Sequence, residues 1–202
     1  MNTESKRIIS LYQTHAQAWT EARLRDGRFD EKHWLDRFLT LLPMDGVILD
    51  LGCGAGVPVA QYCGKRGFAV TGVDGASAMI ARFRANLPGV EAIAADMRTL
   101  QLDRTFNGIL AWDSFFHLTA QDQRRMFKTF RTHAAPGAAL MFTSGSEQGE
   151  AIGCLEGEPL YHASLDTSEY RYLLECEGFV VLAHAETDVS CGGRTIWLAQ
   201  LV

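Results

Sequence analysis

The chain has 202 residues, a formal charge of −5 and a hydrophobic fraction of 47%. This length suits one well-filled core and is short for two, so we expect a single domain over residues 1–202. No apolar run reaches the roughly 18 residues that a membrane-spanning helix needs, and the start, Met1–Lys6, lacks the apolar core of a signal peptide. We expect a cytoplasmic protein that uses neither membrane nor nucleic acid as a partner, because phosphate binding draws on clustered Lys and Arg.

The five cysteines are odd in number and include no C-x-x-C pair. Neither a disulfide framework nor a zinc site is therefore indicated, and no other spacing in the chain points to a metal. We expect the cysteines to be reduced and mostly to fill the interior.

Two helices are predicted at the start of the chain, from about Glu4 to Arg25 and from Asp30 to Leu42, with a break at Gly27. Five short apolar runs follow and have the length of buried strands. These runs are Val47–Leu51, Phe68–Val73, Val90–Ala94, Phe106–Trp112 and Ala138–Thr143. Because helical segments lie between most of them, we expect parallel strands joined by crossovers, which predicts an α/β sheet with helices on both faces.

A further helix is predicted over Thr119–His133, with Thr119 as its cap and Pro136-Gly137 after its end. It carries the nearest thing to a basic cluster in the chain, made of Arg124, Arg125, Lys128 and Arg131. We interpret this cluster as the solvated face of an amphipathic helix.

The segment from Gly145 to Ser164 is rich in glycine and acid, and we expect a long loop there, of the kind that covers or binds a ligand. A helix capped at Asp166 follows. Two strands, Phe179–Ala185 and Arg194–Leu201, are then joined through Ser190-Cys191-Gly192-Gly193. A short Gly-Gly connection predicts an antiparallel hairpin rather than another crossover.

The first predicted strand runs into a glycine-rich turn, Asp50-Leu51-Gly52-Cys53-Gly54-Ala55-Gly56-Val57. Glycines after a first strand let backbone approach a nucleotide-like ligand, while the next helix offers free N–H groups. The NAD pattern is G-x-G-x-x-G, and Val57 stands where its third glycine belongs. The spacing thus fits a dinucleotide imperfectly. Acids also close the second and third strands, at Asp74 and Asp96, and a carboxylate at Asp74 could accept both ribose hydroxyls.

These motifs together resemble those of the class I S-adenosylmethionine-dependent methyltransferases. Asp50–Gly56 is similar to their first motif, Asp74 to their ribose acid, and Ala95-Asp96-Met97 to their adenine-edge motif. Ile109–Asp113 and Ala135–Ala138 are similar to the fourth-strand motif and to the turn before strand five. The resemblance implies a Rossmann-like three-layer αβα sandwich, in which a mostly parallel seven-stranded sheet ends in an antiparallel hairpin.

The resemblance also implies a role for each of three segments of the chain and a set of cofactor contacts. Helices in residues 1–43 would cover S-adenosyl-L-methionine, residues 44–145 would bind it, and residues 146–202 would hold the acceptor loop, a helix and the terminal hairpin. Asp50 would lie near the ammonium, Asp74 would hold the ribose, and Asp96 would accept from the adenine amino group. The full set of implied contacts is Tyr12, Trp19, Arg23, Asp50, Gly52, Cys53, Gly54, Asp74, Gly75, Asp96, Met97, Ala111 and Trp112.

Methyl transfer is an in-line displacement that depends mainly on alignment. His117 and His162 are the candidate bases for the acceptor proton, with a structural role as the alternative for each. Trp112, Phe115 and Phe116 are candidates for an aromatic wall beside the cationic donor, and core packing is the alternative for the two phenylalanines.

The predicted acceptor is a small molecule, because no appended recognition domain or basic patch favours a macromolecule; a protein or nucleic-acid acceptor is the alternative. Glu156 and Glu158 of the predicted loop would face an opened pocket and suit a cationic acceptor such as an amine, and a plain solvated loop is the alternative. Two other functions stay open at this stage: an NAD-dependent oxidoreductase, and a protein that binds S-adenosylmethionine without catalysis. We expect a monomer or a homodimer.

Overall fold

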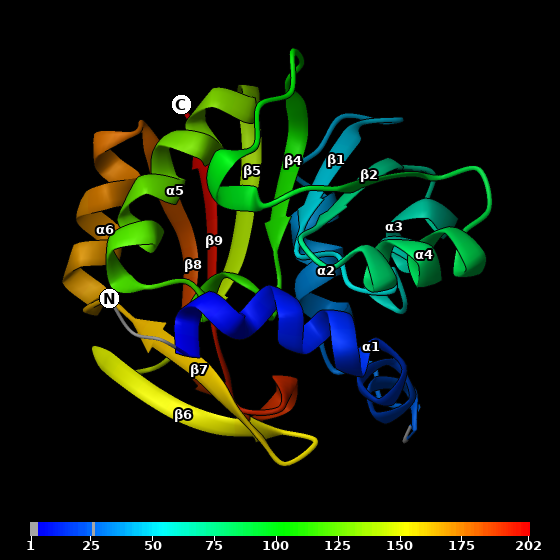
Figure 1. Ribbon diagram of the computed structural model, residues 1–202. Helices are drawn as coiled ribbons and strands as arrows, with labels where there is room; N and C mark the ends of the chain where they lie inside the picture. The colour runs from blue at the N-terminus through cyan, green and yellow to red at the C-terminus, as the bar shows by residue number, and fades with distance from the viewer. Residues whose placement is uncertain (1–3, 26) are drawn as a thin grey trace.

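The computed structural model describes residues 4–25 and 27–202. Residues 1–3, which belong to the expected N-terminal segment 1–43, and residue 26 lie outside this description. Within the described ranges, one sheet has seven strands in the order β3-β2-β1-β4-β5-β9-β8 (Figure 1). The strands are β1 (Val47–Leu51), β2 (Ala69–Asp74), β3 (Glu91–Ala94), β4 (Phe106–Ala111), β5 (Ala134–Ser144), β8 (Phe179–Asp188) and β9 (Arg194–Leu201).

The sheet is parallel from β3 to β5 and antiparallel from β5 through β9 to β8. The prediction of a mostly parallel sheet that ends in an antiparallel hairpin is therefore confirmed. Helices flank the sheet and also cross the edge where its parallel strands end. They are α1 (Ile8–Leu24), α2 (Lys32–Leu39), α3 (Val59–Lys65), α4 (Ser77–Asn86), α5 (Ala120–His133) and α6 (Thr167–Cys176). Short 3₁₀ turns are η1 (Glu4–Arg7), η2 (Met97–Thr99), η3 (Phe115–His117) and η4 (Val189–Cys191).

Two buried clusters hold the layers together, one on each face of the sheet. Phe115, Phe127 and Phe142 belong to the cluster under α5 and α6, and Phe38 and Phe83 belong to the cluster under α2, α3 and α4. Each of these five side chains is fully buried. Burying a side chain of this size contributes about 1.5–3 kcal/mol, so the aromatic residues supply a large share of the packing energy.

Strand β5 begins earlier than the sequence predicts. It starts at Ala134, directly after α5, so Pro136-Gly137 lies inside the strand and not in a turn before it. The pairing with β4 shifts at this point, from Phe106 opposite Ala134 to Gly108 opposite Ala139. A bulge absorbs the extra residues, since proline has no N–H to donate to the ladder and Gly137 adopts a left-handed φ of 75°.

The prediction of a long loop from Gly145 to Ser164 is wrong. This segment folds as an antiparallel hairpin of β6 (Gly149–Leu155) and β7 (Glu158–Ser164), which is separate from the main sheet. Glu156 and Gly157 form its turn with φ values of 51° and 83°, the left-handed pair that tight hairpins favour. Almost all of β6 is exposed, so its sequence lacks the apolar alternation that marks a strand.

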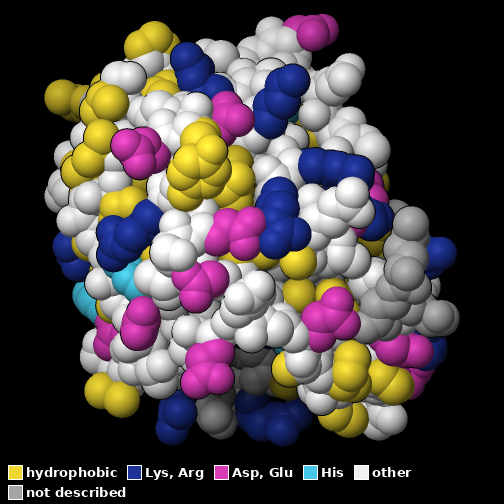
Figure 2. Space-filling view, turned by 90° about the vertical axis from the view of Figure 1, so that its left-hand side faces the viewer, with side chains coloured by type: hydrophobic (Ala, Val, Ile, Leu, Met, Phe, Trp, Pro, Cys, Tyr) yellow, Lys and Arg dark blue, Asp and Glu magenta, His cyan; other side chains and the backbone are white. Residues whose placement is uncertain are grey.

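The hairpin and α1 lie beside each other below the sheet in Figure 1, at the carboxyl ends of the parallel strands. On another side of the molecule, over α5 and α6, basic and acidic side chains alternate and form no continuous basic surface (Figure 2). Arg124 of the predicted basic cluster pairs with Glu169 at 2.6 Å. Across the described part of the chain, no helix combines the length and apolarity needed to cross a membrane.

Candidate active site

Three carboxylates meet where neighbouring parallel strands end. Asp50 is in β1, Asp74 closes β2, and Asp96 follows β3. Asp50 is 3% exposed, and its burial, reinforced by the nearby charge of Asp74, raises its pKa to about 7. The Asp74 carboxylate accepts hydrogen bonds from the backbone N–H groups of Gly54 at 3.0 Å and Ala76 at 2.8 Å. Burial raises the pKa of Asp74 although these two bonds act in the opposite sense.

The glycine turn has no room for side chains. Gly52 and Gly54 have left-handed φ values of 76° and 52°. A Cβ on Gly52 would lie 2.2 Å from the Cβ of Ser114, and one on Gly54 would lie 3.2 Å from the ring of Trp19. The Gly52 N–H also donates to the carbonyl of Val73 at 2.7 Å, which fixes the turn against β2. Bare backbone therefore forms this wall.

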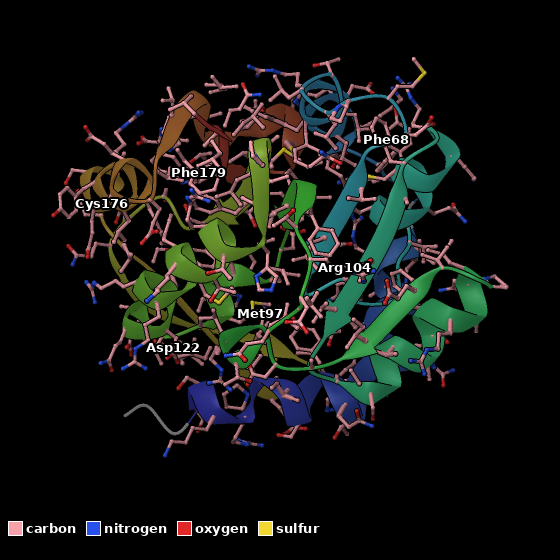
Figure 3. The ribbon with its side chains drawn as sticks, turned by 90° about the horizontal axis from the view of Figure 1, so that it is seen from above. Phe68, Met97, Arg104, Asp122, Cys176 and Phe179 are labelled. Atoms are coloured by element: carbon pink, nitrogen blue, oxygen red, sulfur yellow. The ribbon has the colours of Figure 1, made fainter. Side chains whose placement is uncertain are left out.

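A narrow cleft of about 100 Å³ lies between the strand ends and α1. Its lining includes Gly52, Gly54, Asp74, Gly75, Asp96 and Met97 from the sheet side. Ile9, Tyr12 and Trp19 of α1 close it from the other side. In Figure 3, Met97 and Asp122, which both line this cleft, lie on the side of the molecule where α1 runs. The structure thus brings together most of the residues expected to contact the nucleoside part of the cofactor.

Asp96 has a partner that the sequence does not predict. Its carboxylate accepts from the Arg98 backbone N–H at 2.9 Å and from Arg98 Nε at 2.9 Å. Burial acts to raise the pKa of Asp96, but the bonds from Arg98 outweigh it and lower the pKa. A second carboxylate, Asp122, lies 3.6 Å from the Arg98 guanidinium. The predicted role of Asp96 toward the adenine amino group stays a prediction.

A second, smaller cavity adjoins the glycine turn on the far side of Trp19. Its lining includes Arg23, Asp50, Cys53 and Trp112, all predicted cofactor contacts. The Arg23 guanidinium forms an ion pair with Glu31, which is 1% exposed. Ala111, the remaining predicted contact, is fully buried at the end of β4.

A larger cavity of about 720 Å³ opens beside these two. It shares Tyr12, Trp19, Asp113 and His117 with the narrow cleft. The hairpin forms its opposite wall, which includes Glu147, Glu150 and His162. We call it the acceptor cavity, after the methyl acceptor that the sequence analysis predicts.

The two glutamates predicted to face the pocket do not line the acceptor cavity, so this prediction is wrong. Glu158 instead accepts hydrogen bonds from Arg7 Nη2 and His15 Nε2, both at 2.7 Å. Glu156 lies in the hairpin turn. Because strand side chains alternate between faces, a loop prediction could not tell which glutamates face the cavity.

His117 is 6% exposed and connects α1 to the hairpin. Its Nδ1 lies 2.8 Å from the carbonyl oxygen of Tyr161, and its Nε2 lies 2.8 Å from the hydroxyl of Tyr12. Burial, together with the neighbouring His162, lowers the pKa of His117 to about 4, against the opposing effect of the Tyr161 carbonyl. A carbonyl only accepts, so Nδ1 carries the proton, and in the neutral ring Nε2 accepts from the Tyr12 hydroxyl.

His162 lies on β7, with its ring centroid 4.8 Å from that of His117 and 5.3 Å from that of Phe116. It is half-buried, and burial lowers its pKa below the ordinary value. Both histidines are therefore neutral near pH 7, and both border the acceptor cavity.

The predicted aromatic wall is only partly present. Phe115 is fully buried in the core against Phe127 and Phe142, so its assignment to the wall is wrong and the packing alternative is correct. Phe116 borders the acceptor cavity, and Trp112 borders the smaller cavity.

Two functional candidates were missed by sequence reasoning. They are Asp113, which has a left-handed φ of 48°, and Arg194. The Asp113 carboxylate forms a bidentate ion pair with Arg194, at 2.8 Å from Nε and 2.7 Å from Nη2. Asp113 borders all three cavities. Its position right after a buried strand was the available signal, whereas nothing in the sequence indicates pairing with a residue 81 positions away. Within the described residues, no group of His, Cys, Asp or Glu could hold a metal ion, and all five cysteines are free.

Comparison with known proteins agrees with this geometry. Residues 48–137 match a family described as "Methyltransferase domain". This segment of the chain is therefore similar to methyltransferase domains. No curated protein matches the sequence.

Solved structures extend the similarity to the whole fold. CalS10 from Micromonospora echinaspora, an amino pentose methyltransferase with bound SAM, has a TM-score of 0.73 at 22% identity, covering 92% of this chain and 97% of its own. The 1,6-didemethyltoxoflavin-N1-methyltransferase of Burkholderia thailandensis has a TM-score of 0.73 at 16% identity, covering 98% and 87%. DhpI, in complex with SAH, has a TM-score of 0.72 at 18% identity, covering 97% and 96%. The fold is that of the S-adenosylmethionine-dependent methyltransferases.

Proposed function

We propose that this chain transfers a methyl group from S-adenosylmethionine to a small-molecule acceptor bound in the acceptor cavity. The observation that carries the proposal is the junction of two cavities at Tyr12, Trp19, Asp113 and His117. One cavity lies on the strand-end acids and glycines, and the other lies against the hairpin with its neutral histidines. A protein that binds the cofactor without catalysis has no need for a second cavity of about 720 Å³ at this junction.

The residues present fit the cofactor. Gly52 and Gly54 leave a wall of bare backbone, and Asp74 is held by two N–H groups at the end of β2 where a ribose acid belongs. Asp50, Arg23 and Trp112 border the cavity on the other side of the turn. Met97, Gly75 and Asp96 would hold the adenine end, and Tyr12 and Trp19 of α1 would cover the bound molecule.

When bound, S-adenosylmethionine supplies an electrophilic methyl group on a cationic sulfur. The chain itself aligns the acceptor and excludes water, and alignment of this kind contributes roughly 7–11 kcal/mol to lowering a barrier. The shared residues at the junction are those in position to set that alignment.

An acceptor oxygen or nitrogen loses a proton when it is methylated, and His162 is the better placed of the two predicted bases. It borders the acceptor cavity and is neutral at pH 7, so it can accept a proton. Nε2 of His117 already accepts from Tyr12, and burial, with a smaller effect from Asp113, raises the pKa of that phenol well above its usual range. We therefore assign His117 to positioning Tyr12 and the hairpin.

Charge around the acceptor cavity favours a cationic or amine acceptor. Residues 145–164 contain four glutamates and no Lys or Arg. Arg23 and Arg194, which also border the cavity, are both paired with carboxylates. The wall formed by Glu147 and Glu150 thus leaves a net negative field, which attracts cations.

Isothermal titration with S-adenosylhomocysteine and NADH tests the cofactor, and transfer of labelled methyl to a panel of small amines, alcohols and carboxylic acids tests the acceptor. We expect S-adenosylhomocysteine to bind, NADH not to bind, and amines to be the fastest acceptors. Tight binding of NADH alone would overturn the proposal. A cytoplasmic location, a monomeric or homodimeric state and the division into residues 1–43, 44–145 and 146–202 are parts of the same proposal.

A further inference from the structure

Three buried polar side-chain atoms in the described part of the chain have no hydrogen-bond partner, and two of them belong either to a residue that borders the small cavity or to the ion-pair partner of one. They are Nε1 of Trp112 and one carboxylate oxygen of Glu31, and the third is on His184 of β8. A buried N–H without an acceptor costs about 1–3 kcal/mol, so such groups are rare in folded chains unless a ligand completes them.

The surroundings of Trp112 contain charges but no acceptor for its indole N–H. The side chain is 5% exposed and borders the small cavity beside the glycine turn, together with Arg23 and Asp50. The Arg194 guanidinium carbon lies 5.8 Å from the ring centroid, which places a cation over the face of the ring. A cation on the face leaves the in-plane N–H without a partner.

Arg23 makes this end of the small cavity suited to the carboxylate of a zwitterionic ligand. Its Nη2 pairs with Glu31, and a guanidinium has five donors, which one carboxylate does not use up. Arg194 already donates from Nε and Nη2 to Asp113 and from Nη1 to a backbone carbonyl. The indole N–H and the remaining donors of Arg23 border the same cavity as Asp50, whose carboxylate suits an ammonium group.

We propose that the indole N–H of Trp112 donates a hydrogen bond to the carboxylate of the amino-acid tail of the cofactor. The proposal rests on the proposed function, since the cofactor is S-adenosylmethionine, and it goes further by assigning the tail to one named donor. The tail carboxylate is the anionic group of that molecule, and the small cavity lies on the side of the glycine turn away from the adenine end. Binding then satisfies a group that is unpartnered in the free protein.

The test compares two ligands on three proteins by isothermal titration. S-adenosylhomocysteine carries the amino-acid tail, and 5′-methylthioadenosine has the nucleoside and sulfur without it. Trp112→Phe removes the N–H, and Trp34→Phe is the matched control, because Trp34 belongs to the same buried cluster while its N–H already donates to Asp188 at 2.8 Å. We expect Trp112→Phe to weaken S-adenosylhomocysteine about tenfold or more while methylthioadenosine stays within about twofold.

A measurement on the wild-type protein keeps the test independent of how the variant folds. The indole N–H resonance of Trp112 is assigned on the wild-type protein itself, from the nuclear Overhauser contacts of the ring in nitrogen-edited spectra. We expect saturation with S-adenosylhomocysteine to shift it downfield, and methylthioadenosine to shift it much less. An unmoved resonance, or an equal loss of affinity for both ligands in Trp112→Phe, would overturn the assignment. Failure of the wild-type protein to bind either ligand would overturn the proposed function, and the assignment with it.

Discussion

The proposed cofactor side and the proposed acceptor side of the site are built in different ways. On the cofactor side, the side chains come from the ends of parallel strands, and backbone bonds such as Gly52 N–H to Val73 and Gly54 N–H to Asp74 lock them to the sheet. On the acceptor side, the wall is a hairpin whose strands pair only with each other. The main sheet thus positions the cofactor side of the site. The hairpin of the acceptor side is a separate element that side-chain contacts hold against the rest of the fold.

The largest expected effect is on the cofactor side. Asp74→Ala removes an acceptor proposed to hold two ribose hydroxyls through charge-assisted bonds worth about 1.5–3 kcal/mol each, so we expect a loss of S-adenosylhomocysteine affinity of about a hundredfold or more. Titration calorimetry measures it, and Asp103→Ala, at an exposed acid outside the site, is the control. Unchanged affinity would remove Asp74 from the ribose site.

The matching change on the acceptor side is His162→Ala. We expect kcat to fall about a hundredfold, as for loss of a general base, while affinity for S-adenosylhomocysteine stays the same. His33→Ala, at an exposed histidine outside the described cavities, should leave kcat unchanged. A loss of cofactor affinity in His162→Ala would mean that the two sides are not separable.

The free energy of unfolding should depend on pH with opposite signs for a buried group on each side. His117 has a folded pKa of about 4, below the unfolded value of 6.5, so its contribution is present above pH 6.5 and is lost as pH falls toward 4. Asp50 has a folded pKa of about 7, above the unfolded 3.8, so its contribution is present below 3.8 and is lost as pH rises toward 7.

Each of these two contributions amounts to about 3–4 kcal/mol, and they offset each other between pH 4 and 6.5. We therefore expect urea unfolding of Asp50→Asn to show stability falling on acidification, and His117→Gln to show it rising. The same slope in both variants would contradict the assigned charge states.

The smallest expected effect concerns the connection between the two sides. Glu158→Gln weakens the contacts of β7 with Arg7 and His15, which are exposed or partly exposed. Exposed ion pairs contribute little, so we expect only a small drop in melting temperature, with Glu156→Gln in the hairpin turn as the unaffected control. A large drop would show that the hairpin depends on α1 for its folding.

The sequence predicted the strands and the glycine turn that carry the proposed cofactor residues, because the signals for these elements are local. Strand β1 has the predicted bounds, Val47–Leu51, and the glycine spacing and strand-end acids are tied to the termini of regular elements. The acceptor side could not be predicted in the same way. The exposed strand β6 has no apolar periodicity, and the contacts of Glu158 with His15 and of Asp113 with Arg194 join residues far apart in the chain.

Because the hairpin pairs only with itself, its sequence can change without disturbing the main sheet. A substitution or insertion in β6 or in its Glu156-Gly157 turn breaks no hydrogen bond of the seven-stranded sheet. Under the proposed function, acceptor preference can therefore change through mutations in one short exposed segment while the proposed cofactor site keeps its geometry. The same segment is the place to begin when redirecting this chain to a new acceptor by directed evolution.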